Sequence, residues 1–109
     1  MMIKVDIFRK NGSITKFEMN GHAHYSDGDD IVCASASSVA FACLNGIEKV
    51  INVQFGYETG DGYLLFVLPD DLDKPMQDKV NILTETFFLY IRELESQYPA
   101  HVSVTELEV

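Results

Sequence analysis

The chain has few basic residues, and this shortage limits the partners that it can bind. Its 109 residues include 8 lysines and arginines against 17 aspartates and glutamates, which gives a formal net charge of −9. A strongly negative protein repels phosphate backbones, so we expect no direct binding to nucleic acid. The same charge suits a basic protein partner.

On inspection, the sequence also predicts neither a long apolar segment nor a secretion signal. We find no segment that approaches the roughly 20 apolar residues of a membrane-spanning helix, so we expect no membrane association. Residues 1–7 alternate like a strand and do not form a basic region followed by an apolar run and a cleavage site. We therefore expect a cytoplasmic protein without a signal peptide.

The chain contains only two cysteines, Cys33 and Cys43. If both lie on one helix, the rise of about 1.5 Å per residue places them roughly 15 Å apart. Disulfide formation requires Cα atoms within about 7 Å of each other. We therefore expect two free thiols, as in a reducing compartment.

The spacing of apolar residues predicts four strands in two hairpins. Residues 3–8 and 14–19 alternate in polarity around a turn and predict the first hairpin. Aromatic and β-branched runs at 53–57 and 63–68 flank a glycine-containing turn and predict the second.

Two helices and a closing strand complete the predicted fold. The first helix follows from a stripe of apolar residues three and four positions apart: Ala36, Ala40, Cys43, Ile47 and Val50. The second begins with Pro75 at its first position, stops at Pro99 and has a longer stripe: Met76, Val80, Leu83, Phe87, Ile91, Leu94 and Tyr98. A short strand then contains Val102 and Val104.

These elements predict an α+β fold with the order ββαββαβ, in which two helices pack on a mixed or antiparallel five-stranded sheet. The length allows one hydrophobic core, so we expect a single domain over residues 1–109. Ile82, Phe88 and Leu89 lie off the main stripe of the second helix and add apolar surface. A homodimer through the helices would bury this surface, and so would packing beneath the first helix.

The chemistry is expected in residues 21–37, where His22 and Cys33 flank a small polar loop. Asp30 can cap a helix that starts just before Cys33. A thiol reacts as its thiolate, which the positive end of a helix and a nearby imidazole both favour. Unpaired amides of that first turn could also stabilise an oxyanion. Asp27 and Asp29 act in the opposite direction, because their negative charges disfavour a thiolate.

Other interpretations of these residues remain open. Cys33 could be a small buried apolar residue at a helix start, which is the interpretation that we adopt for Cys43. His22, His24, Asp30 and Cys33 offer four potential metal ligands, but their spacing matches no recognised structural zinc site. We therefore predict neither a metal nor another cofactor.

The serines after Cys33 do not indicate a serine hydrolase. Neither a base nor a nucleophile-elbow glycine pattern accompanies Ser35, Ser37 and Ser38. Ser37 lies one helical turn after Cys33, so its hydroxyl could form a hydrogen bond in the same pocket.

Two short motifs in residues 21–37 closely resemble the signature of the bacterial ribosomal-processing cysteine proteases called Prp. They are Gly21-His22-Ala23 and Asp30-Ile31-Val32-Cys33-Ala34, the latter followed by Ser37. The chain length and the predicted order of elements also agree with that family. The resemblance thus covers essentially the whole chain, although its specific part is this segment.

The resemblance implies a cysteine endopeptidase that removes the N-terminal extension of a large-subunit (50S) ribosomal protein during ribosome maturation. Cys33 would be the nucleophile and His22 the base. Asp30 and Ser37 would support the loop and the pocket, and Gly21 would leave room for the substrate. It further implies a homodimer through the helices and a mobile loop between histidine and cysteine.

Two other functions stay open at this point. The chain could be a non-catalytic binding or assembly module on the ribosome, in which Cys33→Ala would leave its role intact. It could also be a redox sensor, because an exposed, reactive thiol is readily oxidised. No resolving cysteine is expected near Cys33, since Cys43 lies on a different helical turn.

Overall fold

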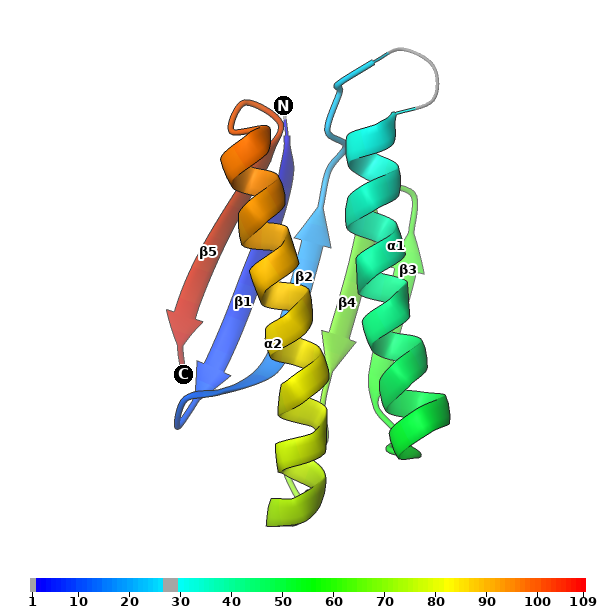
Figure 1. The fold of residues 1–109 in the computed structure, drawn as a ribbon, viewed down its shortest axis with the longest axis vertical. Coiled ribbons are helices and arrows are strands. Elements are labelled where there is room, and N and C mark those ends of the chain that lie inside the picture. The colour runs from blue at the N-terminus through cyan, green and yellow to red at the C-terminus, as the bar shows by residue number, and fades with distance from the viewer. Residues whose placement is uncertain (1, 27–29) are drawn as a thin grey trace.

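The computed structural model describes residues 2–26 and 30–109, and it forms two layers, a five-stranded sheet and two helices that cover one of its faces (Figure 1). The elements are β1 (Ile3–Lys10), β2 (Ser13–Asn20), α1 (Ile31–Asn45), the π-helical segment η1 (Gly46–Ile51), β3 (Gly56–Gly60), β4 (Tyr63–Val67), α2 (Lys74–Gln97) and β5 (Val102–Glu108). The predicted α+β class and the order ββαββαβ are confirmed.

The sheet is mixed, with the strand order β3-β4-β2-β1-β5. The pairs β3/β4, β4/β2 and β2/β1 are antiparallel, whereas β5 runs parallel to β1. Figure 1 shows α2 in front of β1 and β2 and α1 in front of β4 and β3. The segment after β2 therefore crosses from the middle of the sheet to the start of α1.

Three stacked phenylalanines join the sheet to α2. The ring of Phe17 on β2 lies 4.8 Å from that of Phe66 on β4 and 4.3 Å from that of Phe87 on α2. All three side chains are fully buried or nearly so. Aromatic stacking of this kind adds to the stability gained by burying the rings, so these residues form the centre of the core.

Two predicted strand and helix boundaries were wrong. The strand expected from residue 53 begins at Gly56, because Val53 instead donates its N–H to the carbonyl of Ile47 and closes the end of η1. Pro75 is the second residue of α2 and not the first, since Asp73 is the cap and the helix begins at Lys74. The predicted end before Pro99 is confirmed.

The predicted stripes each differ from the structure at one residue. Val50 is 78% exposed, because it lies in η1, where π-helical winding replaces the α-helical period. Thr84, which the prediction omitted, is fully buried in α2. Its hydroxyl donates to the carbonyl of Val80 at 3.2 Å, which allows a polar side chain to occupy this core position.

The expectation that no segment is long and apolar enough for a membrane span was wrong. Ile31–Ile51 meets this criterion by length and composition, because η1 continues α1 and α1 itself contains no charged residue. In the fold, Ala36, Ala40 and Ile47 are completely buried in the core. The structure therefore uses this segment as the core helix of a two-layer domain.

The additional apolar residues of α2 have two different environments. Phe88 lies against two guanidinium groups, those of Arg9 at 4.9 Å and Arg92 at 5.3 Å from its ring centre. Ile82 and Leu89 are each 67% exposed. Burial beneath the first helix is therefore wrong for these two residues.

The phenylalanine stack makes a testable prediction about stability. Phe17→Ala should lower the free energy of unfolding by about 3–5 kcal/mol, because it removes a buried ring and leaves a cavity between the layers. Phe17→Leu is the matched control and should cost clearly less, since it fills most of the space. Urea unfolding followed by circular dichroism measures both values. Equal losses for the two variants would contradict the proposed importance of ring packing.

Candidate active site

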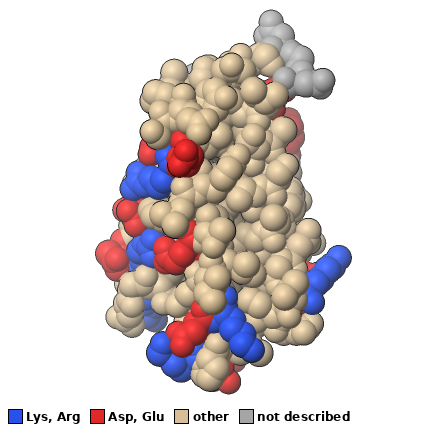
Figure 2. Space-filling view, in the orientation of Figure 1, with Lys and Arg blue, Asp and Glu red and all other residues tan. Residues whose placement is uncertain are grey.

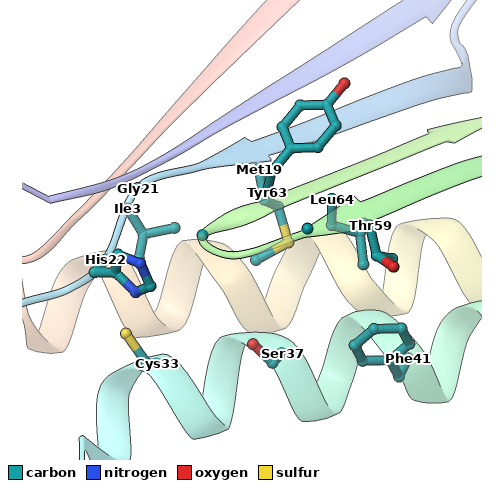
Figure 3. Close-up of a pocket in the computed structure, with 12 residues that line it drawn as sticks. Ile3, Met19, Gly21, His22, Cys33, Ser37, Phe41, Thr59, Tyr63 and Leu64 are labelled. Carbon is teal, nitrogen blue, oxygen red and sulfur yellow. The ribbon is translucent and has the colours of Figure 1, made fainter.

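A pocket of about 140 Å³ lies between the first half of α1 and the strand ends beside it (Figure 3). The α1 side consists of Cys33, Ser37 and Phe41. The opposite side includes Gly21 and His22 after β2, together with residues of the β3–β4 hairpin: Thr59, Gly60, Gly62, Tyr63 and Leu64. The predicted residues Gly21, His22, Cys33 and Ser37 are thus brought together around one pocket.

The side chains of His22 and Cys33 face each other across this pocket. Figure 3 shows the sulfur of Cys33 pointing from α1 toward the imidazole of His22. Within the described residues, no hydrogen bond joins the two side chains. Catalytic hydrogen bonds are often long in free enzymes and shorten when substrate binds, so the arrangement suits a thiol and its base before substrate binding.

The sulfur of Cys33 accepts a hydrogen bond from the backbone. The N–H of Ala23 donates to Cys33 Sγ at 3.1 Å, and the Ala23 side chain is completely buried. Such a donor stabilises a thiolate more strongly than a neutral thiol, because hydrogen bonds to charged groups are stronger. Sequence analysis missed this contribution, since the backbone makes it and the alanine side chain has no polar group.

Asp30 caps α1, as predicted, and also fastens the preceding loop. Its Oδ1 accepts from the N–H groups of Val32 and Cys33, each at 3.0 Å, and its Oδ2 accepts from Tyr25 at 2.9 Å. Partial removal from water raises the pKa of Asp30, but backbone donors at Cys33, Tyr25, Val32 and Ser26 outweigh it. The net effect lowers the pKa of this carboxyl group below its ordinary value.

Two of the first-turn amides of α1 that were expected as oxyanion donors, those of Val32 and Cys33, are not unpaired. The amides of Val32 and Cys33 already donate to the Asp30 side chain, and Ala34 donates its N–H to the Asp30 carbonyl. The same cap that starts the helix therefore occupies the Val32 and Cys33 amides, and an oxyanion would have to displace the Asp30 side chain to bind them. Asp30 supports the loop and does not line the pocket.

The β3–β4 turn supports His22, which sequence analysis did not anticipate. The carboxylate of Asp61 lies 3.5 Å from His22 Nε2, but Asp61 is almost completely exposed, so water weakens this contact. The backbone at Gly62 lies against the imidazole, since a Cβ added to Gly62 would be only 2.7 Å from His22 Nε2. A side chain at position 62 would therefore displace the imidazole.

Gly21 lines the pocket, and its backbone conformation also requires a glycine. Its φ is +96°, and an added Cβ would lie 2.6 Å from the carbonyl oxygen of Met2. Its N–H also donates to the carbonyl of Gly62 at 2.8 Å. Glycine thus allows the chain to pass close to the start of β1, and this backbone constraint sets the direction of His22.

Cys43 lies in the core, as predicted, and both cysteines are free. Its thiol points to the carbonyl of Leu83 at 3.7 Å, and burial raises its pKa to about 12. A buried thiol that stays protonated is a poor nucleophile. Cys43 therefore cannot act as a ready resolving partner for Cys33.

The residues weighed as metal ligands do not assemble. The rings of His22 and His24 lie 6.0 Å apart, and within residues 2–26 and 30–109 no three histidine, cysteine or acidic side chains are grouped to hold a metal ion. Asp27 and Asp29, which were expected to oppose thiolate formation, lie outside the described residues. The described groups at the pocket are those of nucleophilic chemistry: a thiol, an imidazole and a backbone donor.

The two oxygens of Asp30 predict different effects for two substitutions. Asp30→Ala should destabilise the protein by about 1 kcal/mol through loss of the helix cap. Asp30→Asn should keep most of that stability, because its single amide oxygen can still cap the helix while the Tyr25 contact is lost. Thermal unfolding of both variants measures these changes, and equal destabilisation would contradict the separate roles of the two oxygens.

The Asp30 pKa also predicts how stability changes with pH. The pKa of Asp30 is lower in the folded protein than its ordinary value of 3.8. Its stabilising effect is therefore present at pH values above 3.8 and is lost as the pH falls through the pKa of the folded protein. Asp30→Asn should reduce this acid-dependent loss. An unchanged acid-unfolding profile for the variant would contradict the assignment.

Comparison with known protein sequences identifies relatives along nearly the whole chain. The family described as cysteine protease Prp matches residues 2–103. The ribosomal processing cysteine protease Prp of Bacillus subtilis is 31% identical over 108 residues, which are 95% of this chain and 96% of that protein. Its namesake from Staphylococcus aureus strain Mu50 is 29% identical over 105 residues, or 93% and 95% of the two chains.

Solved structures share the fold. The chain superimposes with a TM-score of 0.87 and 28% identity on S. aureus Prp in complex with a covalently linked product peptide, covering 96% and 99% of the two chains. The complex of that protease with a substrate peptide gives 0.83, with 28% identity and the same coverage. A crystal structure from Streptococcus mutans also gives 0.83, with 29% identity over 99% of this chain and 96% of that one. This chain therefore belongs to the ribosomal processing cysteine protease Prp family and is a cysteine protease.

Proposed function

We propose that this protein removes the N-terminal extension of a large-subunit ribosomal protein, with Cys33 as nucleophile and His22 as base. The observation that carries the proposal is that the thiol and the imidazole face each other across one pocket while a backbone N–H donates to the sulfur. One relative with 28% identity, the S. aureus Prp, has been crystallised with a substrate peptide and with a covalently linked product peptide.

The two side chains can complete a full cycle of peptide hydrolysis. His22 takes the proton of the Cys33 thiol, and the thiolate attacks the scissile carbonyl carbon to form a tetrahedral intermediate. This intermediate collapses to a thioester as the imidazolium gives its proton to the leaving amine. Water, deprotonated by His22, then attacks the thioester, and the released thiolate regains the proton.

The pocket and the charge of the protein fit an extended peptide from a basic protein. Beyond the thiol, its walls include the apolar side chains of Phe41, Met19 and Leu64, which can hold an apolar residue near the scissile bond. Ser37 exposes a hydroxyl beside them that can bind the peptide backbone. The net charge of −9 attracts a basic substrate such as a ribosomal protein.

The two other candidate functions have less support. A redox switch between the two thiols is disfavoured, because Cys43 is buried in the core against Leu83 of α2, and burial keeps its thiol protonated. A binding module without catalysis needs no thiol opposite an imidazole. It remains the alternative that a direct cleavage assay must distinguish.

The proposal predicts cleavage at one bond in the N-terminal extension of the host's own large-subunit ribosomal protein. Cys33→Ala should abolish cleavage, and His22→Ala should slow it about 100-fold or more, which is the usual contribution of a general base. Cys43→Ala is the matched control, because it removes the other thiol and leaves the pocket unchanged. Mass spectrometry of the peptide products measures the cleavage rate of wild type and of the three variants.

Two outcomes of this assay would overturn the proposal. If folded wild type cleaves neither the peptide nor the intact ribosomal protein, the binding-module function is favoured. If Cys33→Ala retains the cleavage rate of wild type, another residue is the nucleophile.

We also propose that two copies associate through the helices. The surface over the helices contains a large uncharged area, which Figure 2 shows in the orientation of Figure 1. Ile31 on α1 and Ile82, Leu89 and Tyr90 on α2 are all more than 40% exposed, and Ile31 and Tyr90 line one groove between the two helices. Exposed apolar residues on one face are typical of an interface between subunits.

We also propose a cytoplasmic location, where the two free thiols would stay reduced.

Leu89→Glu tests this association. A charge at the centre of an apolar interface should shift the protein from dimer to monomer in sedimentation velocity. Val109→Glu is the control, because Val109 is 69% exposed at the end of the chain after β5. A wild-type monomer at the concentrations used for the cleavage assay would contradict the proposal.

A further inference from the structure

We propose that His101 is a positioning residue that holds the backbone of Ala23, so that the Ala23 N–H donates to the sulfur of Cys33. His101 precedes β5 and does not line the pocket. It therefore acts on the reaction through Ala23 and not by contact with the substrate. The inference rests on the proposed function of Cys33 as nucleophile, and it adds a third residue to that site.

The first step is the hydrogen bond between His101 and Ala23. His101 Nδ1 lies 2.7 Å from the carbonyl oxygen of Ala23. A carbonyl oxygen can only accept, so Nδ1 carries the proton in this contact. The two residues are 78 positions apart in the sequence, so this bond joins the end of α2 and β5 to the segment that contains His22.

The second step is the rigidity of His101 itself. Its backbone N–H donates to the carbonyl of Tyr98 at 2.9 Å, and its carbonyl accepts from the N–H of Ile3 at 3.0 Å. The ring of Tyr25 packs edge-on against the imidazole at 5.4 Å and against Tyr98 at 5.2 Å. His101 is thus fixed to β1 and to the end of α2, and it can serve as an anchor.

The third step connects this anchor to the sulfur. The carbonyl and the N–H of Ala23 belong to different peptide groups, so His101 does not act by polarising the donor. Instead, it fixes the orientation of residue 23, which carries both groups. In this orientation the Ala23 N–H points to Cys33 Sγ, with 3.1 Å between nitrogen and sulfur. Without the anchor, the Ala23 peptide can rotate away and the thiolate loses its donor.

Two substitutions separate the hydrogen bond from ring packing. His101→Phe keeps a ring against Tyr25 and removes the donor. His101→Asn removes the ring and keeps an N–H close to the position of Nδ1. We expect the rate of Cys33 alkylation by iodoacetamide at neutral pH to fall about tenfold in His101→Phe, which corresponds to the loss of one well-placed hydrogen bond. The alkylation rate of His101→Asn should stay within about threefold of wild type, because the variant keeps a hydrogen-bond donor.

Peptide cleavage provides the second measurement. His101→Phe should lower kcat about tenfold and change KM little, because His101 does not contact the pocket. Alkylation of Cys33, located by mass spectrometry, does not depend on peptidase activity. If wild type fails to cleave any substrate, the proposed function fails while the alkylation rates still test the role of His101.

Two results would overturn the inference. An unchanged alkylation rate in folded His101→Phe would show that Ala23 is held without the imidazole. A loss in His101→Asn as large as that in His101→Phe would contradict the assignment to the hydrogen bond, because the Asn variant keeps the donor. His101→Leu replaces the Phe variant if the latter does not fold, and the same comparison with Asn then applies.

Discussion

The position of the thiol depends on how the chain returns from β2 to the start of α1. Two attachments fix this return: Ala23 donates to the sulfur of Cys33, and Asp30 binds the first turn of α1 with one oxygen and Tyr25 with the other. Each attachment joins the histidine side of the loop to the cysteine side. The separation of imidazole and thiol is therefore set by backbone hydrogen bonds and by a single carboxylate.

The sheet and the core supply the frame for these attachments. The close approach of Gly21 to Met2 places the end of β2 beside β1, and the β3–β4 turn approaches the imidazole at Gly62. The stack of Phe17, Phe66 and Phe87 holds α2 on the sheet, and the turn that follows α2 contains Tyr98 and His101. Stability and reactivity are thus coupled, because the groups around the sulfur come from both layers.

Sequence patterns were sufficient for the elements and for the main site residues, but not for the backbone contacts between them. Alternation and helical spacing predicted all five strands and both helices, and Asp30 was identified as a cap from its place before an apolar helix. The roles of Ala23, Gly62 and His101 depend on contacts between distant segments, which no local pattern encodes. The π-helical winding at Val50 was also missed. The amides of Val32 and Cys33 are occupied by a local contact, so their loss as oxyanion donors already follows from the predicted Asp30 cap.

The central claim is that Cys33 is a nucleophile activated by His22. A chloromethyl ketone built on an apolar peptide tests it directly, because this reagent alkylates an activated thiol within a peptide-binding pocket. The account predicts that peptide mapping finds one label per chain, on Cys33, and that labelling is much slower in His22→Ala. Labelling of another residue, or an equal rate in the two proteins, would contradict the account.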